Sequence, residues 1–495
     1  MDHVDVVIVG AGISGISAAW HLKTMCPGKS YAILEGRDAV GGTWDLFRYP
    51  GIRSESDMHT LGFMFKPWEE ARAIADGPSI LNYVNQTADE HGIREHVRFG
   101  HQVKSASWSS QDAAWTIEAE HQGQQVRLSC NMLLMCGGYY KYDDPYLPDW
   151  EGMERFKGTL IHPQLWPQDL DYQGKNVVVI GSGATAMTLV PAMAQNGAEH
   201  VTMLQRSPTY VVSWPSQDKI ANTLRKWLPG KLAYALTRWK NVKNDLDFYH
   251  RTRTEPETVK AELIGLVEQS LGSQYDVEKH FTPSYFPWDQ RLCLIPDDDL
   301  FDVINDGSAS VMTDTIDCFV EDGVKLASGE VLKADIIVSA TGLQLQIMNG
   351  VALSVDSKAV NLPDHWSYKG MMLSGVPNLV QTFGYINASW TLRADLTSEY
   401  AARLVNRLDE TGNTIATPHL RAEDQDMPAR PWIDDFPAGY MQRSMHLFPK
   451  QGDRNPWRNT QDFGEDKRLI RHAHIEDDVL EFTRAPASHA KSKAA

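Results

Sequence analysis

Two glycine-rich segments, 171 residues apart, constrain the fold of this chain most strongly. Residues 10–15 read GAGISG and residues 181–186 read GSGATA, and each follows a short apolar run and precedes a stretch suited to a helix. Such an apolar run is typical of a strand buried in a parallel sheet. A strand, a GxGxxG or GxGxxA turn and a helix together predict a βαβ unit whose helix N-terminus binds the pyrophosphate of a dinucleotide.

The first unit combines the glycines of such a turn with an acidic residue at the matching place. Gly10 allows the tight turn, Gly12 lets the backbone approach a pyrophosphate, and Gly15 lets the helix pack closely on the strand. Ser14 lies within the same turn. Glu35 ends the second predicted strand, where a carboxylate accepts hydrogen bonds from a ribose and repels a 2′-phosphate. A glycine-rich turn without a ligand is the alternative.

The second unit carries a basic residue at the position that Glu35 holds in the first. Arg206 lies 171 residues after Glu35, the same offset that separates the two glycine motifs, and Ser207 follows it. A guanidinium at this position is expected where the ligand carries a 2′-phosphate. The alternative is a solvated surface arginine. The remaining predicted contacts of this unit are Gly181, Gly183, Ala184 and Thr185.

The two units together predict FAD at the first site and NADPH at the second, the pair that an NADPH-driven flavoenzyme needs. The net charge of −17 argues against a nucleic-acid partner, which would require a basic face. Five cysteines without a CxxC pair disfavour a disulfide scaffold and a dithiol centre, and we expect no metal site. The N-terminus lacks the basic region of a signal peptide, so the sequence favours the cytoplasm.

A motif between the two units resembles that of a known family. Residues 156–167 read FKGTLIHPQLWP and match FxGxxxHxxxWP, the fingerprint of the flavin-dependent Baeyer–Villiger monooxygenases. Segments 369–378, 387–392 and 449–452 are similar to the ethionamide-activating branch of that family. The fingerprint residues are Phe156, Gly158, His162, Trp166 and Pro167. The resemblance also implies FAD-binding segments that contain Gly42, Thr43, Trp44, Thr341 and Gly342.

The resemblance implies an α/β fold with two Rossmann-like dinucleotide-binding domains. The FAD domain would comprise residues 1–148 and 339–495, ending in a disordered tail, and the NADP domain residues 149–338. A helical insertion at about 216–285 would lie within the NADP domain. The sequence gives no prediction of the oligomeric state.

The implied activity is oxygenation of a ketone. NADPH would reduce FAD, O2 would add to the flavin at C4a, and the resulting peroxide would convert a ketone into an ester. Oxygenation of organosulfur compounds would be a secondary activity. One alternative is a flavin-containing monooxygenase that mainly oxidises sulfur or nitrogen, although such enzymes usually lack the Trp-Pro ending. Another is a non-catalytic NADPH-binding sensor.

Arg291 matches the catalytic arginine of the family, which would stabilise the peroxide anion as a fixed cation. A structural ion pair with Asp289 is the alternative. Glu55 is the favoured partner of Arg291 and Asp57 its rival. Gln290 stands where many relatives carry a lysine that binds the 2′-phosphate, so the preference for NADPH would depend more on Arg206. For His162 we favour structural coupling over a general-base role.

Residues 216–244 contain seven basic residues and one acidic residue. Leucines at helical spacing, interrupted at Pro229 and Gly230, predict a basic amphipathic helical pair. The favoured expectation is that its apolar stripe packs on the NADP domain while its lysines face water. We favour packing over a second possibility, in which this pair lies on a membrane surface as a peripheral anchor. Trp288 and Trp390 are candidates for lining an apolar substrate cavity, although core packing is the favoured interpretation of each.

Overall fold

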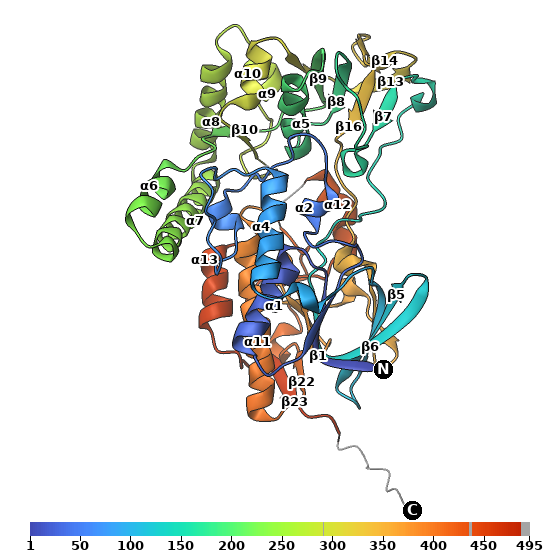
Figure 1. Cartoon of the computed structure of the whole chain (residues 1–495), viewed down its shortest axis with the longest axis vertical. Helices are drawn as coiled ribbons and strands as arrows, with labels where there is room; N and C mark the ends of the chain where they lie inside the picture. The colour runs from blue at the N-terminus through green and yellow to red at the C-terminus, as the bar shows by residue number, and fades with distance from the viewer. Residues whose placement is uncertain (291, 435–437, 487–495) are drawn as a thin grey trace, which may run out of the picture.

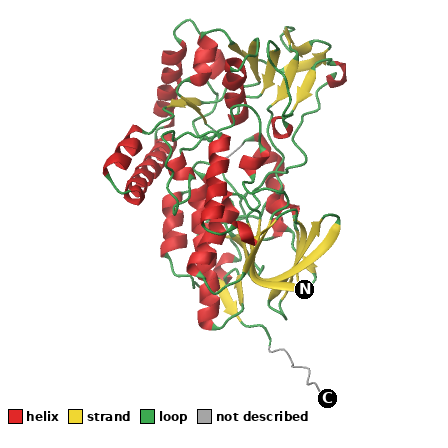
Figure 2. Ribbon diagram, in the orientation of Figure 1, coloured by secondary structure: helices red, strands yellow, loops and turns green. Residues whose placement is uncertain are grey.

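The computed structural model describes residues 1–290, 292–434 and 438–486. Most of its strands gather in two separate groups, with most helices to one side of them (Figure 2). The group that contains β1 and the group that contains β8 are stacked along the long axis of the molecule (Figure 1). Each group corresponds to one of the two glycine-rich units.

The first sheet is built around β1 (Asp2–Val9), which pairs in parallel with β2 (Tyr31–Leu34) and β6 (Gln124–Met135). β2 continues to β3 (Val97–Arg98), and β6 continues through antiparallel β5 (Ala114–His121) to β4 (Gln102–Ser109). Strands from the C-terminal part of the chain complete this sheet. They are β17 (Ala352–Val355), β18 (Lys358–Ala359) and β21 (Leu379–Gln381).

The second sheet is parallel and has the order β12-β9-β8-β16-β7. Val177 and Val179 of its central strand are buried, as the apolar run predicts. The helix α5 (Ala184–Gln195) packs against this sheet. The strands are β7 (Thr159–Ile161), β8 (Asn176–Ile180), β9 (His200–Gln205), β12 (Ala309–Thr313) and β16 (Ile336–Ser339).

Two helices from opposite ends of the chain cover the first sheet. α1 (Ile13–Met25) follows β1 and packs against α11 (Trp390–Thr411). Ile16, Ala19 and Leu22 of α1 are buried in this contact region, as are Leu396 and Tyr400 of α11. The first nucleotide unit is therefore closed by a helix that lies more than 350 residues away in the sequence.

In the sequence, a group of helices separates β10 (Val211–Trp214) from β11 (Cys293–Pro296). The two strands pair in parallel. The predicted break between the first two of these helices is confirmed, because α6 ends at Trp227 and α7 begins at Gly230. The helices are α6 (Lys219–Trp227), α7 (Gly230–Thr254), α8 (Pro256–Leu271) and α9 (Val277–Phe281). None of the described helices is both long and apolar enough to cross a membrane.

The packing of α7 differs from the expectation that its leucine stripe packs on the NADP domain. Ala233, Tyr234 and Thr237 are buried, and the Tyr234 hydroxyl donates to the Phe63 carbonyl beside α3 (Met58–Leu61) at 3.0 Å. Leu232 and Leu236 each precede a buried position by one residue, about 100° around the helix, and are exposed. The expected packing of this stripe is therefore wrong.

Candidate functional site

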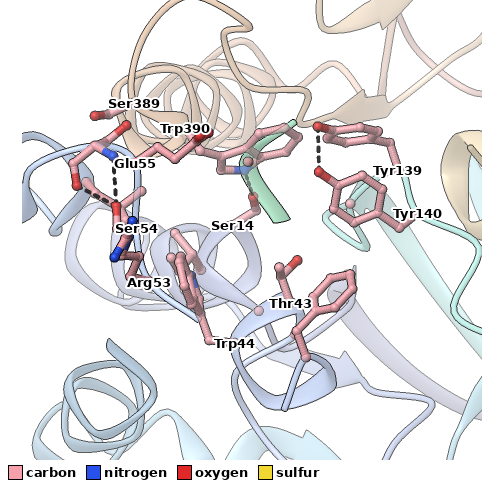
Figure 3. A pocket seen from close by; sticks show the side chains of 18 of the residues that line it. Ser14, Thr43, Trp44, Arg53, Ser54, Glu55, Tyr139, Tyr140, Ser389 and Trp390 are labelled. Carbon is pink, nitrogen blue, oxygen red and sulfur yellow. Dashed lines mark hydrogen bonds between the residues drawn. The ribbon is translucent and has the colours of Figure 1, made fainter. Parts of the chain in front are cut away.

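The first glycine motif forms a turn with little free space. A methyl group on Gly15 would lie 1.9 Å from the Gly10 carbonyl oxygen, and Gly10 itself has φ 101°. Among the described residues no side chain caps the N-terminus of α1, which begins after Gly12. The first amides of α1 are thus available to an anionic ligand. Ser14 of this turn accepts a hydrogen bond from Trp390 Nε1 at 2.8 Å (Figure 3).

Glu35 is buried at the end of β2, with only 7% of its surface exposed. Its Oε2 accepts the Ala11 amide at 2.7 Å and its Oε1 accepts the Arg37 amide at 2.9 Å. Desolvation raises the pKa of the Glu35 carboxyl, and the two amide hydrogen bonds oppose that rise. Each carboxylate oxygen keeps a lone pair for a further donor, as ribose binding requires.

Both glycine motifs open onto one cavity of about 1410 Å³. This volume exceeds the roughly 300–1,000 Å³ of an ordinary small-molecule pocket, so the cavity has room for more than one ligand. Thr43 and Trp44 of α2 (Thr43–Leu46) extend toward it (Figure 3). Other predicted site residues in the described wall are Gly10, Gly12, Ser14, Glu35, Gly42, Glu55, Asp57, Gly183, Ala184, Thr185 and Gly342.

The second unit is more open than the first. Arg206 and Ser207 are exposed at the carboxyl end of β9, and Gln290 is half-buried. A methyl group on Gly181, which has φ 135°, would lie 2.4 Å from the Ala340 carbonyl oxygen. Predicted residues that lie outside the described cavity wall are Gly15, Gly181, Arg206, Ser207, Gln290 and Thr341.

The fingerprint motif connects the two units through His162. The Nδ1 of this buried ring accepts the Gln164 amide at 3.1 Å, and its Nε2 lies 3.2 Å from the Gly342 carbonyl. A ring that accepts at Nδ1 and faces a carbonyl at Nε2 is neutral, with its proton on Nε2. Burial also lowers the pKa of His162. Both ring nitrogens are thus used in structural hydrogen bonds, which supports the coupling role.

The other fingerprint residues lie around the second sheet. Phe156 packs on Phe319 with the ring centroids 6.3 Å apart, and half-buried Trp166 packs against the core of the second unit. Gly158 immediately precedes β7, and Pro167 is half-buried. Thr341 Oγ1 lies 2.9 Å from Ser339 Oγ at the end of β16. The motif therefore borders the second sheet and the segment that returns to the first.

The two candidate carboxylates, Glu55 and Asp57, lie in different surroundings. Glu55 lines the cavity (Figure 3). Asp57 is the N-cap of α3, and its Oδ1 accepts the amides of His59 at 2.9 Å and Thr60 at 3.2 Å and the Asn241 side chain at 3.0 Å. Asp57 thus has a structural role in joining α3 to α7. Arg291 lies outside the described residues.

Sequence reasoning did not identify Asp245 of α7, which lines the cavity. Its side chain is accessible from the cavity, but the surrounding protein displaces much of the water around it. This desolvation, with a smaller contribution from Asp57, raises the pKa of Asp245 to about 7. No motif marks this residue, because its position depends on how α7 docks on α3.

An aromatic wall surrounds part of the cavity. The two candidate tryptophans, Trp288 and Trp390, belong to its described lining, whereas core packing is the interpretation that the sequence favours. Trp390 stacks on Tyr139 with the ring centroids 5.3 Å apart, and the hydroxyls of Tyr139 and Tyr140 lie 2.9 Å apart (Figure 3). The two tyrosines could not be found from the sequence, since they follow β6 without a recognised motif.

Sequence comparisons relate this chain to flavin enzymes. A family model described as flavin-binding monooxygenase-like matches residues 67–243, and one described as an NAD(P)-binding Rossmann-like domain matches residues 8–76. The chain is 53% identical to the FAD-containing monooxygenase EthA of Mycobacterium tuberculosis, over 98% of this chain and 99% of the relative. It is 45% identical to the probable FAD-binding monooxygenase AlmA of Acinetobacter baylyi, over 97% and 96% of the two chains.

Structural comparisons give the same fold. A steroid monooxygenase solved in oxidised form with NADP superimposes with a TM-score of 0.77 at 20% identity, covering 97% of this chain and all (100%) of the other. An open cyclohexanone monooxygenase structure has a TM-score of 0.76 at 19% identity, covering 98% and 100% of the two chains. These similarities confirm the predicted α/β fold with two Rossmann-like domains.

Proposed function

The chain belongs to the family of FAD-containing monooxygenases, and we propose that it is an NADPH-dependent member whose main reaction converts ketones into esters. Family membership confirms the predicted resemblance and FAD as a cofactor. The observation that carries the proposal is a shared cavity, onto which both glycine-rich units open. A reductant in one unit and a flavin in the other could meet there with O2 and a substrate.

The first unit fits the dinucleotide part of FAD. The uncapped amides of α1 suit its pyrophosphate, and the fixed carboxylate of Glu35 suits a ribose. Thr43 and Trp44 lie on the same cavity wall and would hold the rest of the cofactor. When bound and reduced by NADPH, FAD supplies the activation of O2.

The second unit would bind NADPH through its exposed basic end. Arg206 and Ser207 can reach the 2′-phosphate of a nucleotide on α5 without displacing a buried group. Gln290 adds no charge there, so discrimination against NADH would depend on Arg206.

The described cavity residues would keep water from the reacting atoms. Trp288 and Trp390 provide apolar surface that a ketone with an alkyl or aryl group can contact. Arg291 is proposed from the sequence as the fixed cation, and Glu55 is favoured as its partner because the Asp57 carboxylate caps α3. Oxygenation of organosulfur compounds would use the same cavity.

The proposed reaction is tested by identifying its products. Purified flavin-loaded protein is incubated with NADPH, O2 and a panel of ketones and sulfides, and esters and sulfoxides are separated by mass spectrometry. Ester from at least one ketone supports the proposal, and absence of ester from every ketone overturns it. Sulfoxide or N-oxide alone would favour the flavin-containing monooxygenase alternative, and NADPH oxidation without any product would favour the sensor.

A second test concerns Arg291. Arg291→Ala should abolish oxygenation while NADPH still reduces the flavin, measured by loss of flavin absorbance without O2. Arg127→Ala, at an exposed arginine of β6, is the matched control and should leave both steps unchanged. Unimpaired ester formation by Arg291→Ala would remove the catalytic role.

A further inference from the structure

The α6–α7 hairpin exposes large apolar side chains to solvent. It projects sideways from the body of the molecule (Figure 1). Trp227 is 82% exposed, Trp239 66% and Ile220 55%. Leu232 and Leu236 are exposed on the same helical pair. Single exposed apolar residues are normal on proteins, but a cluster that includes two tryptophans marks an interaction surface.

The basic residues of the hairpin divide into those that bind another group of the protein and those that face solvent. The first group contains Arg225, Lys243, Arg251 and Arg253 as well as Arg238 and Lys240. Arg238 donates to the carbonyls of His59 and Gly62, each at 2.8 Å, and Lys240 pairs with Asp218 at 2.7 Å. Arg238 therefore holds α7 against the rest of the protein, and Lys240 holds α7 against the start of α6. Lys219, Lys226 and Lys231 form the other group: they are exposed, and within the described part of the chain none has a carboxylate at ion-pair distance.

We propose that the hairpin face, comprising Ile220, Trp227, Leu232, Leu236 and Trp239 with Lys219, Lys226 and Lys231, docks on the surface of a bilayer that contains anionic phospholipids. Tryptophan favours the boundary between acyl chains and headgroups, and lysines around an apolar face favour anionic headgroups. The chain carries a net charge of −17, so the positive charge of this face is local and orients the molecule.

A second copy of this chain fits the hairpin face less well. A two-fold interface would place the same surface on both subunits, and the unpaired lysines of one copy would approach those of the other. The mutual repulsion would oppose association, whereas an anionic lipid surface neutralises the same charges.

The hairpin face adjoins the cavity. Trp214, Lys219 and Ile220 are exposed and also belong to the described cavity wall, so the wall reaches the protein surface beside this face. On a membrane this arrangement would admit a sparingly soluble substrate, such as a ketone with a long alkyl chain, directly from the lipid. This substrate class rests on the proposed function, whereas the docking itself does not.

Vesicle flotation tests the docking. Full-length flavin-loaded protein is mixed with vesicles of phosphatidylcholine, with or without phosphatidylglycerol. The wild type should float with the anionic vesicles, and less so at high salt. Trp227→Ser/Trp239→Ser and Lys226→Glu/Lys231→Glu should each weaken partitioning at least about tenfold. The matched controls, Leu266→Ser on α8 and Lys358→Glu on β18, should float like the wild type.

Equal flotation of the wild type and both hairpin variants would overturn the proposal, as would absence of flotation with anionic vesicles. If light scattering instead shows a wild-type dimer that Trp227→Ser/Trp239→Ser dissociates, without vesicle binding, the face belongs to a second copy and the proposal fails. Flavin content and Tm check folding of each variant. Esters formed from a water-soluble ketone test the proposed function separately, and should be unchanged in the hairpin variants.

Discussion

The two glycine-rich units share a sequence pattern but differ in how firmly the rest of the molecule closes them. In the first, Glu35 is 7% exposed and holds two backbone amides, and Ser14 is hydrogen-bonded to Trp390 of α11. In the second, Arg206 is exposed beyond the end of β9. The first unit is therefore built from contacts across the whole chain, and the second presents Arg206, its proposed recognition residue, to solvent.

This difference matches two kinds of ligand. A cofactor that stays bound through many turnovers gains from a closed site whose groups are held in place before binding. A co-substrate that must leave in every cycle is better served by an open site, because release can limit the rate. We infer that the first unit holds resident FAD and that the second exchanges NADPH and NADP.

The largest expected effect tests whether the two turns are interchangeable. The second motif has buried Ala186 where the first has Gly15. Gly15→Ala would place its methyl group 1.9 Å from the Gly10 carbonyl oxygen, so the turn must distort and FAD should be lost. Flavin absorbance of the purified protein measures this loss. Gly28→Ala is the control: apart from its chain neighbours, a methyl group on Gly28 would have no atom within 4 Å, so this variant should retain flavin. Full flavin in Gly15→Ala would contradict the closed first unit.

The next effect concerns the open unit. Arg206→Ala should raise the KM for NADPH by roughly 10–100-fold, because it removes one or two charge-assisted hydrogen bonds to the 2′-phosphate. The KM for NADH should stay nearly unchanged, since NADH lacks this phosphate. Steady-state kinetics with both nucleotides measures the difference. Arg155→Ala, at another exposed arginine, should leave both constants unchanged. An unaltered KM for NADPH in Arg206→Ala would show that recognition lies elsewhere.

A smaller effect is expected for Trp390, the residue through which α11 contacts the turn of the first unit. Trp390→Phe keeps an aromatic ring beside Tyr139 but removes the hydrogen bond to Ser14. The loss of about 1 kcal/mol should weaken FAD binding roughly fivefold. Titration of apoprotein with FAD, followed by flavin fluorescence, measures the Kd. Trp239→Phe is the exposed control and should leave the Kd unchanged. Equal affinity of Trp390→Phe and the wild type for FAD would show that the hydrogen bond to Ser14 does not contribute to FAD binding.

The smallest effect lies at the boundary of the cavity. The pKa of Asp245 is raised from 3.8 to about 7, so the folded protein binds its proton more tightly than the unfolded chain. The resulting stability is fully present below pH 3.8 and is lost as pH rises toward 7. The Asp245 side chain is exposed, so solvent screening reduces this effect. Asp245→Asn should lack the loss and show a Tm profile flatter by about 1–2 °C. Asp247→Asn, which lies on the same helix and faces Lys243, should follow the wild type. Parallel wild-type and Asp245→Asn profiles would contradict the raised pKa.

Much of the fold was predictable because its signals are contiguous in the sequence. A strand, a glycine turn and a helix fix a βαβ unit within about 30 residues, so both units and the fold class follow from residues 4–35 and 176–206. Glu35 and Arg206 directly follow equivalent strands, as the common offset predicts, and Glu35 is buried whereas Arg206 is exposed. The packing of Leu232 and Leu236 was predicted wrongly, because periodicity identifies an apolar face without naming its partner.

The sequence by itself determined the two nucleotide units, the acidic and basic residues that distinguish them, and the fingerprint between them. Only the tertiary structure decided that Trp390 closes the first turn, that Asp57 caps α3, and that Asp245 faces the cavity. The physical reason is that these contacts join segments far apart in the chain. Their geometry depends on how whole helices dock, and α7 docks through Tyr234 and Arg238, which no local motif distinguishes from their neighbours.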